Sequence, residues 1–293
     1  MSHSIRAVSK PRAIMGVILA MAALLSAVPL ATSRAATPDT EQALRAAVDG
    51  PQRTPAFRLR DKYRHPLQTL EFFGIRPDMT VVEVLPGGGW YTEILAPFLR
   101  DRGKLIEATP ALSSANPFFR KGAAAYAAKL SAAPDVYGKV ETTAFEPPDY
   151  MPLGAPGSAD LVVTFLNMHD FVYANVHKEI LSDIVQRFFR SALQVLKPGG
   201  RLGVVAHRAR VGMPLAESLP LGRLPQDYVI QQARRAGLTL VATSEISANP
   251  RDDGTNPVWN LPPTLKQGAQ DREKYLTIGE SDDMTLLFAA PKE

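Results

Sequence analysis

Residues 80–89 have the sequence TVVEVLPGGG, and this stretch decides the fold. The β-branched, apolar run 80–85 predicts a buried strand, and the three glycines after Pro86 predict a tight turn. Residues 90–99 carry apolar side chains at helical spacing, so we expect a helix to follow the turn directly. A glycine-rich turn between a strand and a helix is the position at which α/β sheets bind nucleotides and related ligands.

The same alternation of strands and helices continues on the carboxyl side of this unit. Further strands are predicted at residues 104–108, 140–145, 160–165, 202–206, 238–246 and 284–289. Helices are predicted between several of them, at residues 117–130, 177–196 and 225–236. This pattern predicts an α/β fold with a Rossmann-like, seven-stranded, mostly parallel sheet. No helix is evident before the last strand, so we expect that strand to pair antiparallel.

The first 35 residues differ in character from the rest. They contain four of the 33 bases and no acid, so residues 36–293 carry 29 bases against 29 acids. A basic start, an apolar run over residues 13–31 and the small residues before Ala36 predict a signal peptide cleaved near Ala35, with an uncleaved anchor as the alternative. We therefore expect an exported protein, in the bacterial periplasm, with a helical extension at residues 36–76 and an α/β domain at residues 77–293.

The amino-acid composition excludes several classes of function. The chain is 45% hydrophobic and 21% charged, as a folded globular protein is, and it has no cysteine for a thiolate metal site or a cysteine nucleophile. Nucleic acid is not an expected partner, because the near-neutral residues 36–293 show no basic stripe. No metal site is expected either, since the pair Asp252 and Asp253 is typical of a turn.

The glycine-rich turn does not match two common nucleotide motifs. Thr92 stands where a dinucleotide fingerprint needs a third glycine or alanine, and no Gly-Lys-Ser/Thr follows as in a phosphate-binding loop. Glu83, late in the first strand, can face a ligand held by this loop. The alternative is a tight turn that holds no ligand.

A second turn, LKPGGRL at residues 196–202, completes a resemblance to class I S-adenosylmethionine-dependent methyltransferases. The segments FFGIRPDMTVVEVLPGGGWYTEILAPFL, NMHD and NPRDD resemble, more narrowly, a group of predicted bacterial methyltransferases, many with signal peptides. The resemblance covers roughly residues 54–291. It implies S-adenosylmethionine as the cofactor, held at the following residues: Glu83, Pro86, Gly87, Gly88, Gly89, Glu107, Thr109, Phe145, Glu146 and Asn167.

Within that set, the ribose position departs from the family pattern. The family usually has an acid at the end of the second strand, and this place falls on Thr109. Glu107 lies two residues earlier, on the same face of the strand, and is the substitute that we weigh. Phe145 and Glu146 match the position that contacts the adenine.

Three residues are candidates for catalysis. His169 could act as a general base, with Asp170 to orient it; the alternative is that both cap the following loop. Tyr91 starts the helix beside the glycine loop, where it and Trp90 could wall a ligand, although core packing is equally expected for Tyr91.

The function expected is methyl transfer from S-adenosylmethionine to a small-molecule acceptor. The alternative is an exported, non-catalytic ligand-binding protein. The missing ribose-binding acid favours it, and so does the predicted export, because S-adenosylmethionine is made in the cytoplasm. A nicotinamide-dependent oxidoreductase fits less well, because it needs the third glycine.

Overall fold

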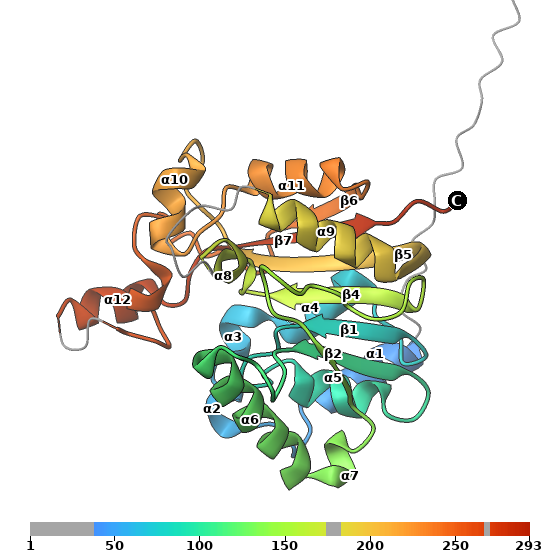
Figure 1. Ribbon diagram of the computed structural model, residues 1–293. Helices are drawn as coiled ribbons and strands as arrows, with labels where there is room; N and C mark the ends of the chain where they lie inside the picture. Colours follow the sequence, from blue (N-terminus) through green and yellow to red (C-terminus); the bar gives the residue numbers. More distant parts are fainter. Residues whose placement is uncertain (1–37, 174–182, 267–269) are drawn as a thin grey trace, which may run out of the picture. The chain divides into compact units, whose positions relative to one another are not determined.

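A seven-stranded sheet organises the computed structural model, which describes residues 38–173, 183–266 and 270–293 (Figure 1). Its strands lie in the order β3-β2-β1-β4-β5-β7-β6. The first five are parallel, and β7 is antiparallel to both of its neighbours. The predicted fold class is thus confirmed, including the antiparallel last strand. The bounds are β1 (Thr80–Val84), β2 (Lys104–Thr109), β3 (Glu141–Ala144), β4 (Ala159–Phe165), β5 (Leu196–His207), β6 (Thr239–Ser244) and β7 (Asp283–Ala289).

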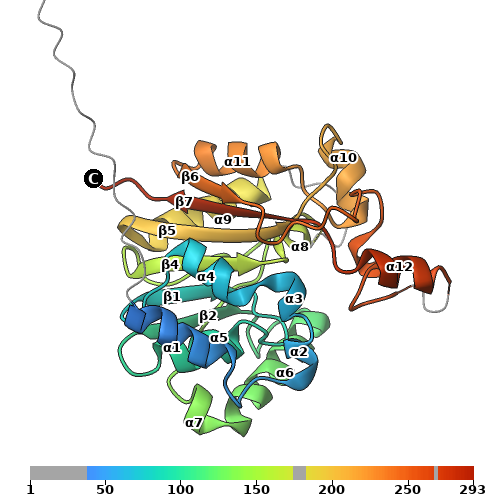
Figure 2. The ribbon, with the colours of Figure 1, turned by 180° about the vertical axis from the view of Figure 1, so that it is seen from behind.

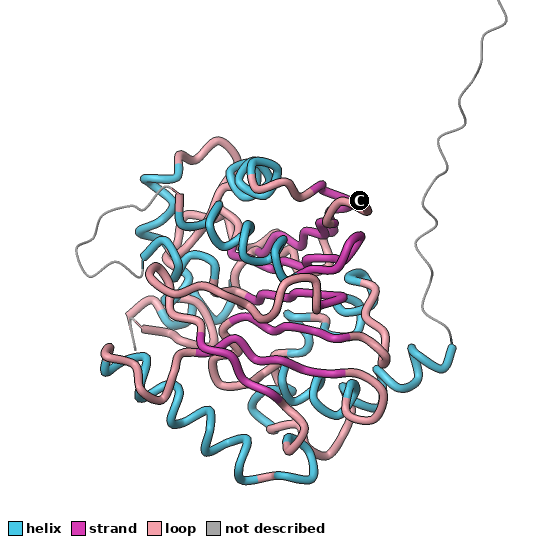
Figure 3. The backbone as a smooth tube through the Cα atoms, turned by 45° about the vertical axis from the view of Figure 1, so that its right-hand side comes forward, coloured by secondary structure: helices cyan, strands magenta, loops and turns pink. Residues whose placement is uncertain are grey.

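Helices lie around the strands, as Figure 3 shows. One face carries α1 (Pro38–Val48), α4 (Pro66–Phe73), α5 (Thr92–Leu99), α6 (Pro117–Ala132) and α7 (Pro134–Tyr137). The other carries α8 (Met168–Tyr173), α9 (Ile184–Val195) and α11 (Gln226–Arg235). Successive side chains of a strand point to opposite faces, so Val82 and Val84 join one core cluster and Val81 joins the other.

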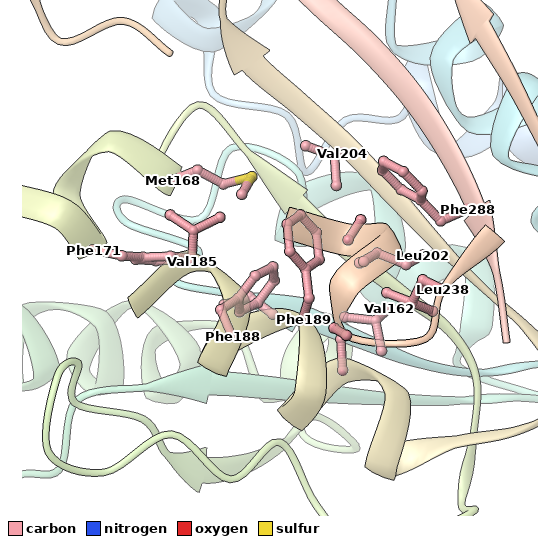
Figure 4. Close-up of a cluster of buried hydrophobic side chains, with 14 of the residues drawn as sticks. Val162, Met168, Phe171, Val185, Phe188, Phe189, Leu202, Val204, Leu238 and Phe288 are labelled. Atoms are coloured by element: carbon pink, nitrogen blue, oxygen red, sulfur yellow. The ribbon is translucent and has the colours of Figure 1, made fainter. Parts of the chain in front are cut away.

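The four-residue spacing of apolar side chains predicted the buried face of α9. Phe188 and Phe189 are completely buried and pack with Phe171 of α8 and Phe288 of β7 (Figure 4). The expected start of this helix, at residue 177, lies outside the described residues.

Residues 38–73 are part of this core. Leu44 of α1 and Leu70 and Phe73 of α4 are buried in the cluster that covers β1 and β4. Between them, α2 (Pro55–Arg58) and α3 (Asp61–Arg64) carry the chain to the carboxyl edge of the sheet (Figure 2). The predicted helical extension therefore supplies one covering layer of the sheet.

The structure departs from the predicted elements in short segments. Residues 196–200, expected as a helix-ending turn, already belong to β5, with a bulge against β4. Four short helical segments occur in regions expected as loop: α10 (Leu215–Ser218), η1 (Leu219–Leu221), η2 (Val258–Asn260) and α12 (Arg272–Ile278). Across the described residues, no helix combines the length and the apolar character that crossing a membrane requires.

Candidate functional site

The loop after β1 lies where the strand order reverses direction, between β1 and β4, which is where open α/β sheets bind ligands. Its backbone is left-handed at Leu85 (φ 50°), Gly87 (φ 59°) and Gly89 (φ 79°). A Cβ atom added to Gly87 would meet nothing within 4 Å. The loop therefore exposes its backbone at Gly87, which lets a ligand approach closely.

Asn167 fixes the gap between the two strands. Its side-chain nitrogen donates to the carbonyl oxygens of Val84 (2.7 Å) and Leu85 (3.2 Å), and its oxygen accepts from the Thr164 hydroxyl. Asn167 is 7% exposed. These bonds occupy its amide group, so Asn167 positions the loop.

Two carboxyl groups are buried side by side beneath the loop. Glu83 and Glu107 are register partners on β1 and β2, and both are almost fully buried. The Thr92 hydroxyl donates to Glu83 Oε2 (3.0 Å) and shares a hydrogen bond with the Tyr126 hydroxyl (2.9 Å), whereas neither oxygen of Glu107 has a hydrogen-bond partner among the described residues.

Burial makes both carboxyl groups weak acids. It raises the pKa of Glu83 to about 7, while the neighbouring Glu107 and Thr92 side chains act to lower it. Burial, followed by the charge of Glu83, holds the pKa of Glu107 well above its usual range. Burial therefore disfavours the charged form of Glu107, whereas a ribose-binding carboxylate is expected to be an exposed anion.

The other predicted cofactor residues lie around the ends of β2 and β3. Thr109 is half-buried at the end of β2, and its carbonyl oxygen accepts from the Phe145 N–H (2.9 Å). Phe145 is completely buried in a core cluster. Glu146 accepts from the Ala111 N–H and the Ser114 hydroxyl (both 3.0 Å), so its carboxylate holds the loop that follows β2.

Side chains of α6 and α2 cover the far end of the glycine loop. A Cβ atom at Gly89 would lie 3.0 Å from Lys129 and 3.2 Å from Tyr126, and one at Gly88 would lie 3.5 Å from Phe57. Lys129 is held there by an ion pair with the buried Glu93 (2.7 Å). The loop is therefore open to a ligand at the backbone of Gly87 and covered at Gly89, and the Thr109 hydroxyl stands where the methyltransferases that the sequence resembles have an acid.

The aromatic pair that starts the helical turn after this loop is buried. Trp90 lies between the guanidinium groups of Arg53 and Arg64, each 4.8 Å from its ring centroid. Tyr91 stacks on Phe165 with ring centroids 3.4 Å apart and is 3% exposed. Burial raises the pKa of Tyr91 above its ordinary value, so the phenol remains protonated. These contacts favour core packing for both rings.

Two histidines meet at the carboxyl edge of β4 and β5. The rings of His169 and His207 lie 5.2 Å apart. His207 Nδ1 is 2.8 Å from Asp283 Oδ1 and 2.7 Å from Ser281 Oγ, and Ser281 also donates to Asp283 (2.8 Å). A carboxylate at Nδ1 keeps the proton on that nitrogen and leaves Nε2 as the basic atom.

His169 has a different environment. Its Nε2 lies 3.2 Å from Asp170, whose side chain is 64% exposed. Burial, followed by the nearby His207, lowers the pKa of His169 to about 3. A group with such a pKa is a poor base at neutral pH, so the geometry favours His207 over the predicted His169.

A cavity of about 370 Å³ opens beside this cluster. Its lining comes from α3 and from the segments after β6 and before β7, which gather at one end of the sheet in both ribbon views (Figures 1 and 2). Ser247 and Ser281 lie on its wall; Ser247 also lines a narrow recess that reaches Tyr91 and Leu166. We call this cavity the edge cleft; it is lined by Lys62, Tyr63, His65, Ser247, Ala248, Asn249, Arg251, Glu280 and Ser281.

Asp283, Ser281 and Ser247, which lie around His207 or line the edge cleft, were not among the residues that the sequence singled out. The register of β5 with β7 pairs His207 with Asp283, and only the antiparallel pairing brings them together. A sequence signal did exist, since an antiparallel strand begins at the edge where its parallel neighbour ends.

The remaining polar candidates serve local structure. Asp252 forms a completely buried ion pair with Arg223 (2.8 Å), and Asp253 accepts from the Thr255 hydroxyl and N–H. Arg208 pairs with Asp282 and Glu245. Throughout the described part of the chain, no group of three or more acids and histidines is arranged to hold a metal ion.

Comparisons with known proteins define the class of fold. No protein-family model matches the sequence, and no curated protein matches it significantly. Among solved structures, the [4+2]-cyclase SpnF is 17% identical with a TM-score of 0.53, covering 86% of this chain and 93% of that one. A candidate sarcosine dimethylglycine methyltransferase from Galdieria sulphuraria is 12% identical with a TM-score of 0.51, covering 82% and 92%.

These likenesses and the strand order show that the chain has the class I methyltransferase fold. At such low identity they establish the fold alone, and one of the two similar structures is named for a cyclisation. Function must therefore be argued from the site.

Proposed function

We propose that this protein transfers a methyl group from S-adenosylmethionine to a small-molecule acceptor. The observation that carries the proposal is the left-handed loop at Leu85, Gly87 and Gly89, open at Gly87 and placed at the switch point of a methyltransferase fold. The bound cofactor supplies an activated methyl group. The backbone at Gly87 and the hydroxyl of Thr109 would hold it at the carboxyl ends of β1 and β2.

In this proposal His207 removes the proton from the acceptor. Asp283 and Ser281 hold its Nδ1, so Nε2 is the nitrogen that accepts a proton. His169, at 5.2 Å, is neutral at physiological pH and restricts where the His207 ring can lie. Methyl transfer depends strongly on positioning, which this buried network supports.

The experiment uses S-adenosylmethionine labelled in its methyl group, mixed with protein and fractionated small-molecule extracts. We expect label in a product, and a rate at least about 100-fold lower for His207→Gln, the range expected for loss of a general base. His169→Gln should have a clearly smaller effect. Equal losses in both variants would contradict the assignment of the base to His207.

A second candidate is an exported ligand-binding protein without catalysis. The specific observations in its favour are the completely buried Glu107, the hydroxyl of Thr109 at the ribose position and the cover of Lys129 and Tyr126 over Gly89. Failure to bind the cofactor product would favour this candidate.

We further propose that the protein is exported, on the evidence of the basic and apolar residues 1–35. Mass spectrometry of the protein from its native host should give a mature N-terminus near Ala36. A mature chain that begins at Met1 would contradict export by cleavage.

A further inference from the structure

The edge cleft carries more positive charge than its own acid can neutralise. Glu280 already accepts two hydrogen bonds from Arg60 (2.6 and 2.8 Å) and lies 3.8 Å from Arg64. Lys62 and Arg251 add two further cations to the lining. Across the described residues neither of them forms an ion pair: Lys62 contacts the ring of Tyr63, and the Arg251 guanidinium lies beside Gly279, where an added Cβ atom would be 3.3 Å from it.

The wall of the cleft is fixed by hydrogen bonds. Asn249 donates to the carbonyl oxygens of Ile278 (2.9 Å) and Glu280 (2.6 Å) and accepts from the Arg251 N–H (3.1 Å). The loop that carries Arg251 is therefore held by hydrogen bonds, and the exposed side chains of Arg251 and Lys62 reach the cleft from two different segments. Two cations without acidic partners on one cleft favour an anion by their charge.

Ser247 gives an independent sign of a ligand. Its residue is 5% exposed, and its hydroxyl oxygen is buried without a hydrogen-bond partner among the described residues. A buried hydroxyl without a partner costs free energy, which a ligand atom in the cleft would recover. Ser281, on the same wall, is hydrogen-bonded to Nδ1 of His207, so the cleft lies next to a residue that holds the proposed base.

We infer that the edge cleft binds an oxyanion, a carboxylate or phosphate group of the methyl acceptor, on Lys62 and Arg251, beside Ser247. The assignment of that ligand as the acceptor rests on the proposed function. Such a group would hold the molecule at the mouth of the cleft while its other end points toward Ser281 and His207. The acceptor is then an acidic small molecule.

The test measures saturable binding of two probes, inorganic phosphate by ³¹P line broadening and malonate by ¹³C line broadening. The full chain is compared with Lys62→Gln/Arg251→Gln. A matched control, Lys274→Gln/Arg234→Gln, removes the same charge: Lys274 also contacts a neighbouring tyrosine ring, and both control residues are exposed and outside the cleft lining.

We expect the cleft variant to weaken binding at least tenfold and the control variant to change it less than twofold. Loss of phosphate alone assigns a phosphate, loss of malonate alone assigns a carboxylate, and loss of both supports the oxyanion class. Equal affinities in the cleft and control variants, or no saturable binding of either probe, would overturn the inference.

Neither probe needs the methyl-donor site, so the two hypotheses can fail separately. Titration of the cleft variant with S-adenosylhomocysteine should match that of the unchanged protein. If the oxyanion binds in the cleft while S-adenosylhomocysteine binds to neither protein, the anion site stands and its assignment to a methyl acceptor falls.

Discussion

Glu107 shows how one buried side chain can limit a family-based assignment. Its place on β2 made it a reasonable substitute for a ribose-binding acid, because two residues along a strand keep the same face. The structure buries it completely beside Glu83, and this burial raises its pKa. Sequence alone could give the face of the strand but not the depth at which the carboxyl group lies.

Replacing Glu107 with Gln should change how stability depends on pH. The folded protein holds the protons of Glu83 and Glu107 more tightly than the unfolded chain does. The pair therefore stabilises the fold fully below about pH 4.5, and this contribution is lost as pH rises through about 7. Gln imitates the protonated acid at every pH. The free energy of unfolding of the variant should therefore increase relative to that of the unchanged protein as pH rises, by up to about 1.4 kcal/mol per pH unit.

Urea unfolding at pH 5, 6, 7 and 8 measures this difference in the free energy of unfolding. Arg234→Gln, an exposed change on α11, is the control and should show no such trend. A difference between Glu107→Gln and the unchanged protein that stays constant with pH would contradict the buried acid pair.

At the scale of elements, the segment between β6 and α12 depends on one buried ion pair. Arg223 and Asp252 are both completely buried, 2.8 Å apart, and Asp252 also accepts from the N–H groups of Gly254 and Asp282. Arg223 donates to the carbonyl oxygens of Asn256 and Arg208. The pair thus ties residues 252–256 to the carboxyl end of β5 and the amino end of β7, beside the edge cleft.

Arg223→Met should destabilise the protein by about 3–5 kcal/mol, because it leaves the carboxylate of Asp252 buried without its partner. Thermal and urea unfolding measure the loss. Arg234→Met, at an exposed position on α11, should stay within about 0.5 kcal/mol of the unchanged protein. An equally small effect of Arg223→Met would show that this pair does not hold the segment.

The long elements could be predicted from sequence and the short ones could not. Strands β1 and β4 and helix α9 bury regular apolar patterns, so the pattern itself specifies them. In contrast, η2 lies within residues 249–271, a stretch rich in Pro, Gly, Asn and Asp, and α12 follows that stretch with only seven residues. Their order comes from tertiary contacts, such as Asn249 on the carbonyl oxygens of Ile278 and Glu280, which no local pattern reveals.

At the scale of the folded unit, the helices at residues 38–73 are a layer that the sheet needs. Leu44 and Phe73 are almost fully buried in the cluster over β1 and β4. Glu93 of α5 accepts from the N–H and hydroxyl of Thr54 (2.7 and 2.6 Å), and Arg53 lies beside it. Sequence predicted helices here, but only the structure shows which face they bury.

Truncation of the chain tests whether the helices at residues 38–64 are needed to cover the sheet or are a dispensable extension. A chain that starts at Ala36 should unfold cooperatively with near-ultraviolet circular dichroism like that of the full protein. A chain that starts at Pro66 should lose that signal, because it exposes the apolar face of β1 and β4 to water. Cooperative unfolding of the shorter chain would contradict this role for α1 to α3.

The central claim is that the loop after β1 holds the methyl donor. The most direct test is calorimetric titration of S-adenosylhomocysteine into the full chain, Gly87→Asp and Gly122→Asp. A Cβ atom at Gly87 would meet no protein atom within 4 Å, so an aspartate side chain there would enter the ligand's space, at some backbone strain because φ is 59°. Gly122 on α6 is equally open to a Cβ atom. We predict micromolar binding that Gly87→Asp weakens at least tenfold and Gly122→Asp preserves. No binding at millimolar ligand, or equal affinity in all three proteins, would contradict the account.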